Sequence, residues 1–454
     1  MSDTGGIKKV SQWVGLALLT SLFAVWPVVH TISLRDLLLV SGVGIFSYLA
    51  VQKHPSRWWS CIEWPVGLYF TLTLWMLVVA VFISPETNWS LNEIRGQWLK
   101  GVLALLAGGL AGFAIRQDPT VRRIVVTLFL VTLLLHIVYV DYLGLKMLLK
   151  NGQILRDLAG GLTQGPDASN YLTNMLLVLL LAETFIRLTY RQRYLSLPNA
   201  ALFVAILLAL FSVYAESVRN GIVEIAFILL VFVVLFVLEN RQRMSKAIIV
   251  LIVSTAFVIP GVFSYLSYKM DVRWETFFET VPLALDTDTN RQWISIKKKD
   301  ELKLSSGELV DWSNYMRLAR MKAGIDLTLE NPWGVGFGRN AFGHAVMKKY
   351  GESSSHSHSG LIDLAVGTGI PGTLLWIGFL TSLATLGWRS FRRTQDYCAL
   401  ALLLLVTGYG TRMVLDSTIR DHMLQMFLFL AAFLAVIAAG QLARQRALTA
   451  APPG

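Results

Sequence analysis

Long apolar runs separated by short polar loops make up most of this chain. A helix needs about 20 mostly apolar residues to cross a bilayer. Twelve runs approach or reach that length, which predicts an all-α polytopic membrane protein with about 12 transmembrane helices. The expected spans are residues 13–29, 36–51, 64–83, 98–115, 124–143, 171–186, 200–214, 221–238, 247–265, 361–386, 399–414 and 424–443.

Basic residues gather in alternate loops. Residues 8–9, 122–123 and 392–393 are basic clusters on one side, whereas the loops of the other side carry mostly single cations such as Arg35 and Arg95. Cytoplasmic loops are enriched in Lys and Arg. We therefore expect the clustered loops and both chain termini to lie in the cytoplasm.

One polar segment, residues 266–358, is far longer than the other loops. It divides the chain into three parts. Residues 1–265 hold spans one to nine, 266–358 form an outer loop with short helices, and 359–454 hold spans ten to twelve and a cytoplasmic tail.

A helix is expected inside the outer loop. An apolar stripe at helical spacing runs through residues 318–329, Ser313 can cap its start, and Asn331 with Pro332 ends it. The glycine-rich run that follows, residues 334–338, is expected to be a backbone turn and not a nucleotide-binding loop, because no strand precedes it.

Composition agrees with the hydropathy pattern. Hydrophobic residues make up 54% of the chain and charged residues only 15%, against about 25% charged residues in soluble domains. The net charge of +11 suggests nucleic-acid binding at first, but the excess follows the loop pattern, so we expect no nucleic-acid partner. Cys61 and Cys398 are expected to be free thiols.

The sixth, eighth, tenth and twelfth spans begin on the outer side with polar or charged residues: Asn170, Arg219, His358 and residues 420–422. Helix N-termini attract anions, because they expose N–H groups and a partial positive charge. A cation such as Arg219 needs compensation there. It either snorkels or pairs with Glu216, or it binds an anionic group; since ionisable residues at membrane depth are functional candidates, we favour the anion.

Two pairs of charged residues are further candidates. Arg317 alone is most simply a solvated surface residue, but Arg320 lies one turn away and the two could clamp a phosphate. Arg412 and Asp416, four residues apart at the outer end of the eleventh span, are most simply a salt bridge.

Residues 353–372 form the junction between the outer loop and the tenth span. His356 and His358 lie in a serine-rich run, and they are ordinary loop histidines, a metal-binding pair in need of a third ligand, or a general base with an acceptor hydroxyl. Farther on, three glycines and a proline in residues 367–372 predict close helix packing or a kink.

In their order and spacing, these residues resemble the superfamily of O-antigen ligases and O-antigen polymerases, which are bacterial inner-membrane glycosyltransferases. The family has a long periplasmic loop that ends in a His and a small polar residue, followed by apolar residues and Gly-x-x-Gly. Here these are His358 with Ser359, and residues 369–372. The resemblance covers the hydropathy of the whole chain, with its specific motifs in residues 170–372.

Three other positions carry the resemblance. Arg317 precedes a Pro-x-x-Gly-x-Gly turn at residues 332–336, Arg219 lies near Gly221, and Asn170 opens a helix. The chain also departs from the pattern. Asn220 is inserted between the Arg and the Gly, and the family often has Ala-His-Asn where this chain has residues 357–359.

The resemblance implies a membrane-embedded glycosyltransferase of the C-type class, in the inner membrane of a Gram-negative bacterium, with a periplasmic active site. It implies transfer of a glycan from undecaprenyl pyrophosphate to a sugar of lipid A-core, with no metal or other cofactor. His358 would be the catalytic base, and Arg219 and Arg317 would bind the pyrophosphate. Asn170, Arg320, His356, Arg412 and Asp416 are secondary candidates.

Other functions remain open. A polymerase of the same superfamily would extend a second lipid-linked unit, and a related branch transfers the glycan to protein. A twelve-span transporter or flippase commonly shows repeats and charges at the membrane midplane, and we find neither in the sequence. A receptor would use the loop only for binding.

Overall fold

The computed structural model describes residues 4–51, 61–152, 160–163, 165–252, 276–294, 302–305, 307–352 and 354–450, with the single positions 154, 254 and 258. Over these residues the chain is all-helical, and the only β-type pairing is an isolated bridge between Lys303 and Leu309. Ten helical segments of the described chain are long and apolar enough to cross a membrane. The chain is therefore a polytopic helical membrane protein, as the hydropathy pattern predicts.

The first half of the chain supplies seven of these segments. Its elements are α1 (Thr4–Val25), α2 (Ile32–Val51), α3 (Glu63–Val78) with the π-helical turn η2 (Val79–Ile83), α4 (Thr87–Glu93), the π-helical turn η3 (Ile94–Trp98), α5 (Leu99–Ile115), α6 (Pro119–Asn151), α7 (Pro166–Tyr190), α8 (Asn199–Glu216) and α9 (Arg219–Asn240).

The second half holds the loop helices and three further segments. Its elements are α11 (Phe277–Leu285), the 3₁₀ turn η6 (Arg291–Ile294), α12 (Trp312–Glu330), α13 (Ala341–Tyr350), α14 (Gly360–Thr394), α15 (Tyr397–Leu415) and α16 (Asp421–Ala450).

Ten of the twelve expected spans coincide with these long helices. The first expected span overlaps α1, whose apolar part, Val10–Val25, is shorter. The ninth, residues 247–265, falls mostly outside the described residues. The total of twelve therefore stays a prediction.

Helix α16 lies at the centre of the bundle and packs against α5, α14 and α15. Its contact with α5 depends on glycine. A Cβ atom on Gly108 would lie 2.0 Å from the carbonyl oxygen of Phe429, and one on Gly112 would lie 2.7 Å from that of Phe433. The two backbones thus touch directly, as they do where small residues face a neighbouring membrane helix.

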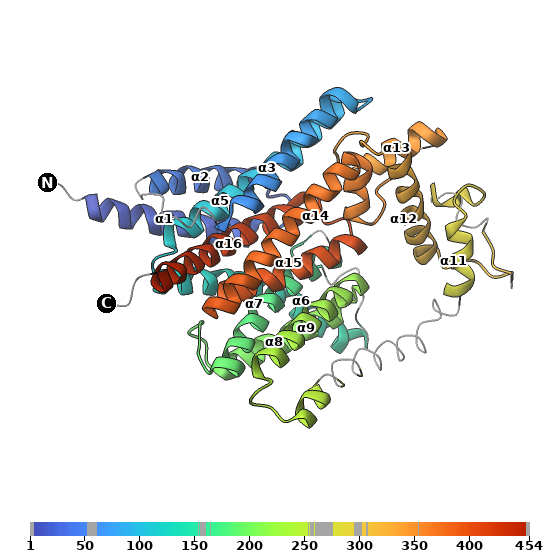
Figure 1. Cartoon of the computed structure of the whole chain (residues 1–454). Coiled ribbons are helices and arrows are strands. Elements are labelled where there is room, and N and C mark those ends of the chain that lie inside the picture. The colour runs from blue at the N-terminus through green and yellow to red at the C-terminus, as the bar shows by residue number, and fades with distance from the viewer. Residues whose placement is uncertain are drawn as a thin grey trace.

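Helices α11, α12 and α13 gather at one end of the bundle, while α1 begins and α16 ends at the opposite end (Figure 1). The loop helices have their own apolar core, in which Trp293, Tyr315 and Phe342 pack with Ile362 and Val366 from the first turns of α14. This shared core fixes the loop helices to the membrane bundle.

Asp311, and not Ser313, caps the start of α12. The Asp311 carboxylate accepts a hydrogen bond of 2.8 Å from the backbone N–H of Asn314. The expectation for Ser313 was wrong because the helix begins at Trp312, which leaves Ser313 inside the first turn. The expected end is confirmed, since Asn331 terminates the helix.

The Pro-x-x-Gly-x-Gly turn, residues 332–336, packs against a break in α14. Gly369 has φ 70° and ψ −173°, which interrupts the helix two residues before Pro371 and confirms the expected kink. The N–H groups of Val335 and Gly336 donate to carbonyl groups of α14, and the N–H of Ile370 donates 2.9 Å to the carbonyl of Pro332. A Cβ atom on Gly369 would lie 2.3 Å from that same carbonyl oxygen, so only glycine permits this approach.

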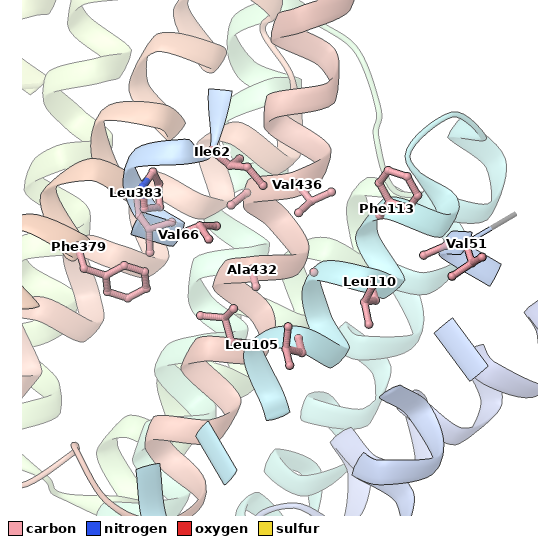
Figure 2. Close-up of a pocket in the computed structure, with 15 residues that line it drawn as sticks. Val51, Ile62, Val66, Leu105, Leu110, Phe113, Phe379, Leu383, Ala432 and Val436 are labelled. Atoms are coloured by element: carbon pink, nitrogen blue, oxygen red, sulfur yellow. The ribbon is translucent and has the colours of Figure 1, made fainter. Parts of the chain in front are cut away.

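An apolar cavity of about 520 Å³ opens between α2, α3, α5, α14 and α16 (Figure 2). Its α16 residues, 432–436, follow the start of that helix by 11 to 15 positions, which corresponds to about 16–22 Å along the axis. The cavity thus lies deep in the bundle, away from the end that carries the loop helices. It is lined by Ala50, Val51, Ile62, Pro65, Val66, Leu105, Leu106, Gly109, Leu110, Phe113, Phe379, Leu383, Ala432, Ala435 and Val436.

Candidate active site

Four helix starts meet around one polar cavity of about 400 Å³. They are the starts of α7, α9, α14 and α16, the same four that the charge pattern places on one side of the membrane. The end of α15 and the loop helix α12 complete the wall. The lining residues are Asp167, Ala168, Asn220, Arg317, His356, His358, Leu415, Asp416, Ser417, Arg420, Asp421, His422 and Met423.

Both histidines of the H-x-H pair line this cavity, with ring centroids 4.5 Å apart. The Nε2 atom of His358 lies 3.4 Å from Nη1 of Arg320, and the Nε2 atom of His356 lies 3.3 Å from Nη2 of Arg420. A guanidinium can only donate. Each Nε2 is therefore the acceptor and carries the lone pair, while the ring proton is on Nδ1.

A buried carboxylate holds the histidine loop in place. Asp363, in the first turn of α14, accepts 2.8 Å hydrogen bonds from the backbone N–H of Ser357 and from the hydroxyl of Ser417. Ser359 caps α14, because its hydroxyl accepts from the N–H of Ile362. His358 lies between these anchors with φ 66°, a left-handed conformation that a non-glycine residue adopts only when its surroundings impose it.

Arg320 is buried behind the histidines and ties the loop to α12. Its guanidinium donates to the Ser355 hydroxyl at 2.9 Å, the His356 carbonyl at 3.2 Å and the Trp293 carbonyl at 3.2 Å. Burial lowers the pKa of Arg320 to about 10, so it remains charged at neutral pH. Arg317 turns elsewhere, donating 2.8 Å to Oδ1 of Asn220. The two arginines of α12 thus contact different neighbours, and a joint phosphate clamp stays a prediction.

The surroundings keep both histidines neutral. The pKa of His358 is lowered to about 4, first by burial and then by the positive charges of Arg320, Arg317 and Arg420. The pKa of His356 is lowered to about 3 by burial, then by Arg420 and its other charged neighbours. Two unprotonated imidazoles among arginines form a site that can accept a proton and hold an anion.

The described residues that line the cavity include Asn220 but not Arg219. Arg219 is the first residue of α9 and is half-buried. Asn220 accepts from Arg317 and donates 2.8 Å to the carbonyl of Leu415, so it bridges α12 and the end of α15. Asn220 is the residue by which this chain departs from the family spacing. The role of Arg219 at the pyrophosphate stays a prediction.

Arg412, fully buried, joins three helices beneath the cavity. It donates 2.8 Å to the side-chain oxygen of Asn170, 2.8 Å to the carbonyl of Asp167 and 3.2 Å to Glu224. It also pairs with Asp416 at 3.3 Å, which confirms the expected salt bridge. Of this group, Asp167 and Asp416 line the cavity, and the rest support it.

Asn170 is a structural residue of this network. Its amide nitrogen donates 2.9 Å to Glu216, whose carboxylate also accepts from Ser169 and Thr173. A Cβ atom on Gly221 would lie 1.7 Å from the Asn170 side-chain oxygen, so glycine there lets α9 meet α7.

The sequence did not indicate how two lining residues contribute. Arg420 was singled out only as a cation at the start of the twelfth span, and its position 64 residues from His356 gave no reason to pair them. Asp167 was one polar residue in a polar connection. Among the residues that the structure describes, no three His, Cys, Asp or Glu side chains cluster as metal ligands, so the H-x-H pair has no third ligand there.

Comparison with known proteins gives one family match. Residues 203–377 match the family model described as O-antigen ligase. This region contains Arg219, Arg317, Arg320 and both histidines, and it ends within α14 beyond the kink. Comparison with the curated proteins finds no match. Over residues 203–377, this membrane protein is therefore similar to the O-antigen ligase family.

Proposed function

We propose that this protein is an O-antigen ligase. It transfers a glycan from undecaprenyl pyrophosphate to a sugar hydroxyl of lipid A-core at the periplasmic face of a Gram-negative inner membrane. Both termini lie in the cytoplasm. The observation that carries the proposal is the cavity in which neutral His358 and His356 lie among Arg317, Arg320 and Arg420.

The arginines suit a pyrophosphate. Guanidinium groups bind phosphate oxygens with two parallel hydrogen bonds. Arg317 and Arg420 line the cavity, and Arg219 lies at the neighbouring helix start. Positive charge held beside the leaving group stabilises the negative charge that develops as its bond to the sugar breaks. Because pyrophosphate is already a good leaving group, a general acid is not needed.

His358 suits the acceptor. The acceptor oxygen attacks the anomeric carbon, and its proton passes to the Nε2 lone pair of His358. The carbon–oxygen bond to the pyrophosphate breaks on the opposite side, and its electron pair leaves with the pyrophosphate. This single displacement inverts the anomeric configuration. The imidazolium then returns its proton to water or to the released pyrophosphate.

Anion binding prepares the base. In the free protein, Arg320 and Arg420 donate toward the two Nε2 atoms. The negative charge of a bound pyrophosphate offsets the positive charges of these arginines, and it therefore raises the basicity of His358 as well as that of His356. The base thus becomes stronger only when the donor is bound.

Reconstitution tests the proposal and separates ligase from polymerase. Purified protein in proteoliposomes receives a lipid-linked glycan together with either lipid A-core or a second lipid-linked unit. A ligase forms lipopolysaccharide with the first and no longer chain with the second. The reverse pattern identifies a polymerase. A second ligase, tested with the same substrates in the same kind of vesicle, is the control. If that ligase is active and this protein forms no product with either acceptor, both the ligase and the polymerase assignments are contradicted.

A deletion strain gives the same distinction in cells. Loss of a ligase leaves lipid-linked polymer accumulating, whereas loss of a polymerase leaves lipid A-core with one unit attached. Loss of a flippase would instead leave the lipid-linked glycan confined to the cytoplasmic leaflet.

A further inference from the structure

A second polar cavity, of about 570 Å³, adjoins the candidate active site. The two cavities share Asp421 and His422 at the start of α16. A narrow void lined by Gln97, Arg339 and Arg420 also lies between them. The second cavity is lined by Pro27, Val28, Val29, His30, Ile32, Arg35, Asp36, Gly96, Gln97, Lys100, Thr163, Arg339, Asp421, His422 and Gln425.

The lining of the second cavity suits a charged saccharide. It offers the cations Arg35, Lys100 and Arg339 together with carboxylate and amide side chains. Such groups hydrogen-bond to sugar hydroxyls and pair with phosphate or carboxylate groups. Lys100 pairs with Asp36 at 2.7 Å in this lining, and both side chains are partly exposed, so either can turn to a ligand.

Two buried polar atoms in this lining lack a partner within the described part of the chain. They are Nε2 of His422 and Nε of Arg35. His422 is only 7% exposed and lies in the wall between the two cavities. Buried polar atoms are nearly always hydrogen-bonded, so these two atoms indicate a ligand that supplies the missing acceptor or donor.

The rim of the second cavity is apolar on one side. Val29, in the connection between α1 and α2, is 40% exposed, and Ile32, the first residue of α2, is 58% exposed. A polar pocket beside an exposed apolar rim at a membrane helix end suits a saccharide that hangs from a lipid anchor.

We propose that the second cavity is the binding site for the acceptor saccharide, with an anionic group of that saccharide against Lys100 and Arg35. The inference rests on the proposed function. A displacement brings its two substrates to opposite sides of the reacting carbon, and each substrate needs its own site. An acceptor seated in the second cavity extends its reactive hydroxyl past His422 toward the histidines of the first cavity.

Gly96 provides a steric test. It lines the second cavity, and an added Cβ atom there would meet nothing within 4 Å. Gly96→Phe should therefore fill space without displacing neighbours, and Gly96→Ala is the small control. Gly67, on the exposed surface of α3, also has nothing within 4 Å of an added Cβ atom, so Gly67→Phe controls for an added aromatic ring.

Lys100→Gln provides an independent chemical test. Arg95→Gln is its control, because Arg95 is exposed in η3 and does not line the cavity. In proteoliposomes with lipid-linked glycan and lipid A-core, Gly96→Phe and Lys100→Gln should each raise the KM for the acceptor at least tenfold. The KM for the donor should stay within twofold, as should both constants in the three controls.

The outcomes separate the sources of the saccharide. A raised KM for the donor, with that for the acceptor unchanged, assigns the cavity to the donor glycan and overturns the proposal. Unchanged constants in both variants overturn it as well. If wild-type protein forms no product, the proposed function fails, and binding then decides: deacylated core oligosaccharide should bind the full chain in detergent, and Gly96→Phe should abolish that binding.

Discussion

Nη1 of Arg320 lies 3.4 Å from Nε2 of His358, at the junction between the loop helix α12 and the start of α14. The same guanidinium holds the backbone carbonyl of His356. One buried cation thus orders the histidine loop and adds to the effect of burial, which lowers the pKa of His358. The roles of the histidines, the roles of the arginines and the pH dependence of transfer can therefore be tested separately.

Removal of the histidine base should abolish most of the transfer. A positioned general base contributes about 10²–10⁴ in rate, so His358→Ala should lower kcat by about that factor. His356→Ala should cost less. Glycan transfer is measured in proteoliposomes and as lipopolysaccharide ladders in a strain without its own ligase. His344→Ala is the control, because His344 lies on α13 beside Glu86 and outside the cavity. Full ladders with His358→Ala would sink the catalytic assignment, and equal loss with His356→Ala would exchange the two roles.

Loss of the cavity arginines should weaken transition-state stabilisation. Removing one electrostatic stabiliser typically costs about 10²–10³ in kcat, and we expect that range for Arg317→Ala and Arg420→Ala. Arg219→Ala tests the residue that the family resemblance selects. Lys322→Ala is the matched control, since Lys322 is on α12 but pairs with Asp326. Wild-type rates in Arg317→Ala or Arg420→Ala, measured with saturating donor, are incompatible with these roles.

The pH profile should differ between free and donor-bound protein. Because the pKa of His358 is lowered to about 4, the imidazole stays neutral from alkaline pH down to about pH 5. The value of kcat/KM should therefore be flat over that range and fall only below it. Bound pyrophosphate raises the pKa of the same group, so kcat should begin to fall at a higher pH than kcat/KM. A fall of kcat/KM centred near the ordinary histidine pKa would contradict this environment.

Arg320 provides the control for that profile. After burial, its positive charge makes the largest contribution to the lowered pKa of His358. Arg320→Gln should move the acidic limb of kcat/KM to higher pH, whereas Arg320→Lys keeps the charge and should move it less. Lys322→Gln should leave the limb in place. A purely structural role for Arg320 would change the rate at every pH without moving the limb.

The kink in α14 should be sensitive to one methyl group. Gly369→Ala requires φ 70° and places a Cβ atom 2.3 Å from the Pro332 carbonyl oxygen. Strained backbone of this kind costs about 1–3 kcal/mol, and the clash adds to it. Thermal unfolding in detergent should therefore begin at a lower temperature than in the wild type. Gly67→Ala is the control and should leave the transition unchanged, because an added Cβ atom at Gly67 has open space around it. Equal stability of Gly369→Ala and Gly67→Ala would contradict this prediction.

Transfer should continue in excess chelator. The proposed mechanism assigns charge stabilisation to Arg317 and Arg420 and proton removal to His358, so no step depends on a metal ion. Product formation is measured with and without EDTA in metal-free vesicles. Activity that EDTA removes and Mg²⁺ or Zn²⁺ restores would reverse this expectation.

The sequence by itself determined the membrane helices and the side of the bundle on which the chemistry gathers. Hydropathy is a local property, because each span must be apolar over its own length. Ten expected spans could thus be placed without tertiary contacts. Charge alternation likewise grouped the starts of α7, α9, α14 and α16, and all four meet at the cavity. The His358 motif and the Arg412–Asp416 pair are also local patterns.

Tertiary structure alone decided which distant side chains meet. Arg420 faces His356, and Asn220 receives Arg317; each contact depends on how helices far apart in the chain pack, and no local spacing encodes it. The different contacts of the two arginines on α12 also depend on tertiary packing. The histidine loop packs against Arg320, whereas Arg317 faces the cavity. The second cavity follows from this packing too, because α2, η3, α5 and α16 enclose it together.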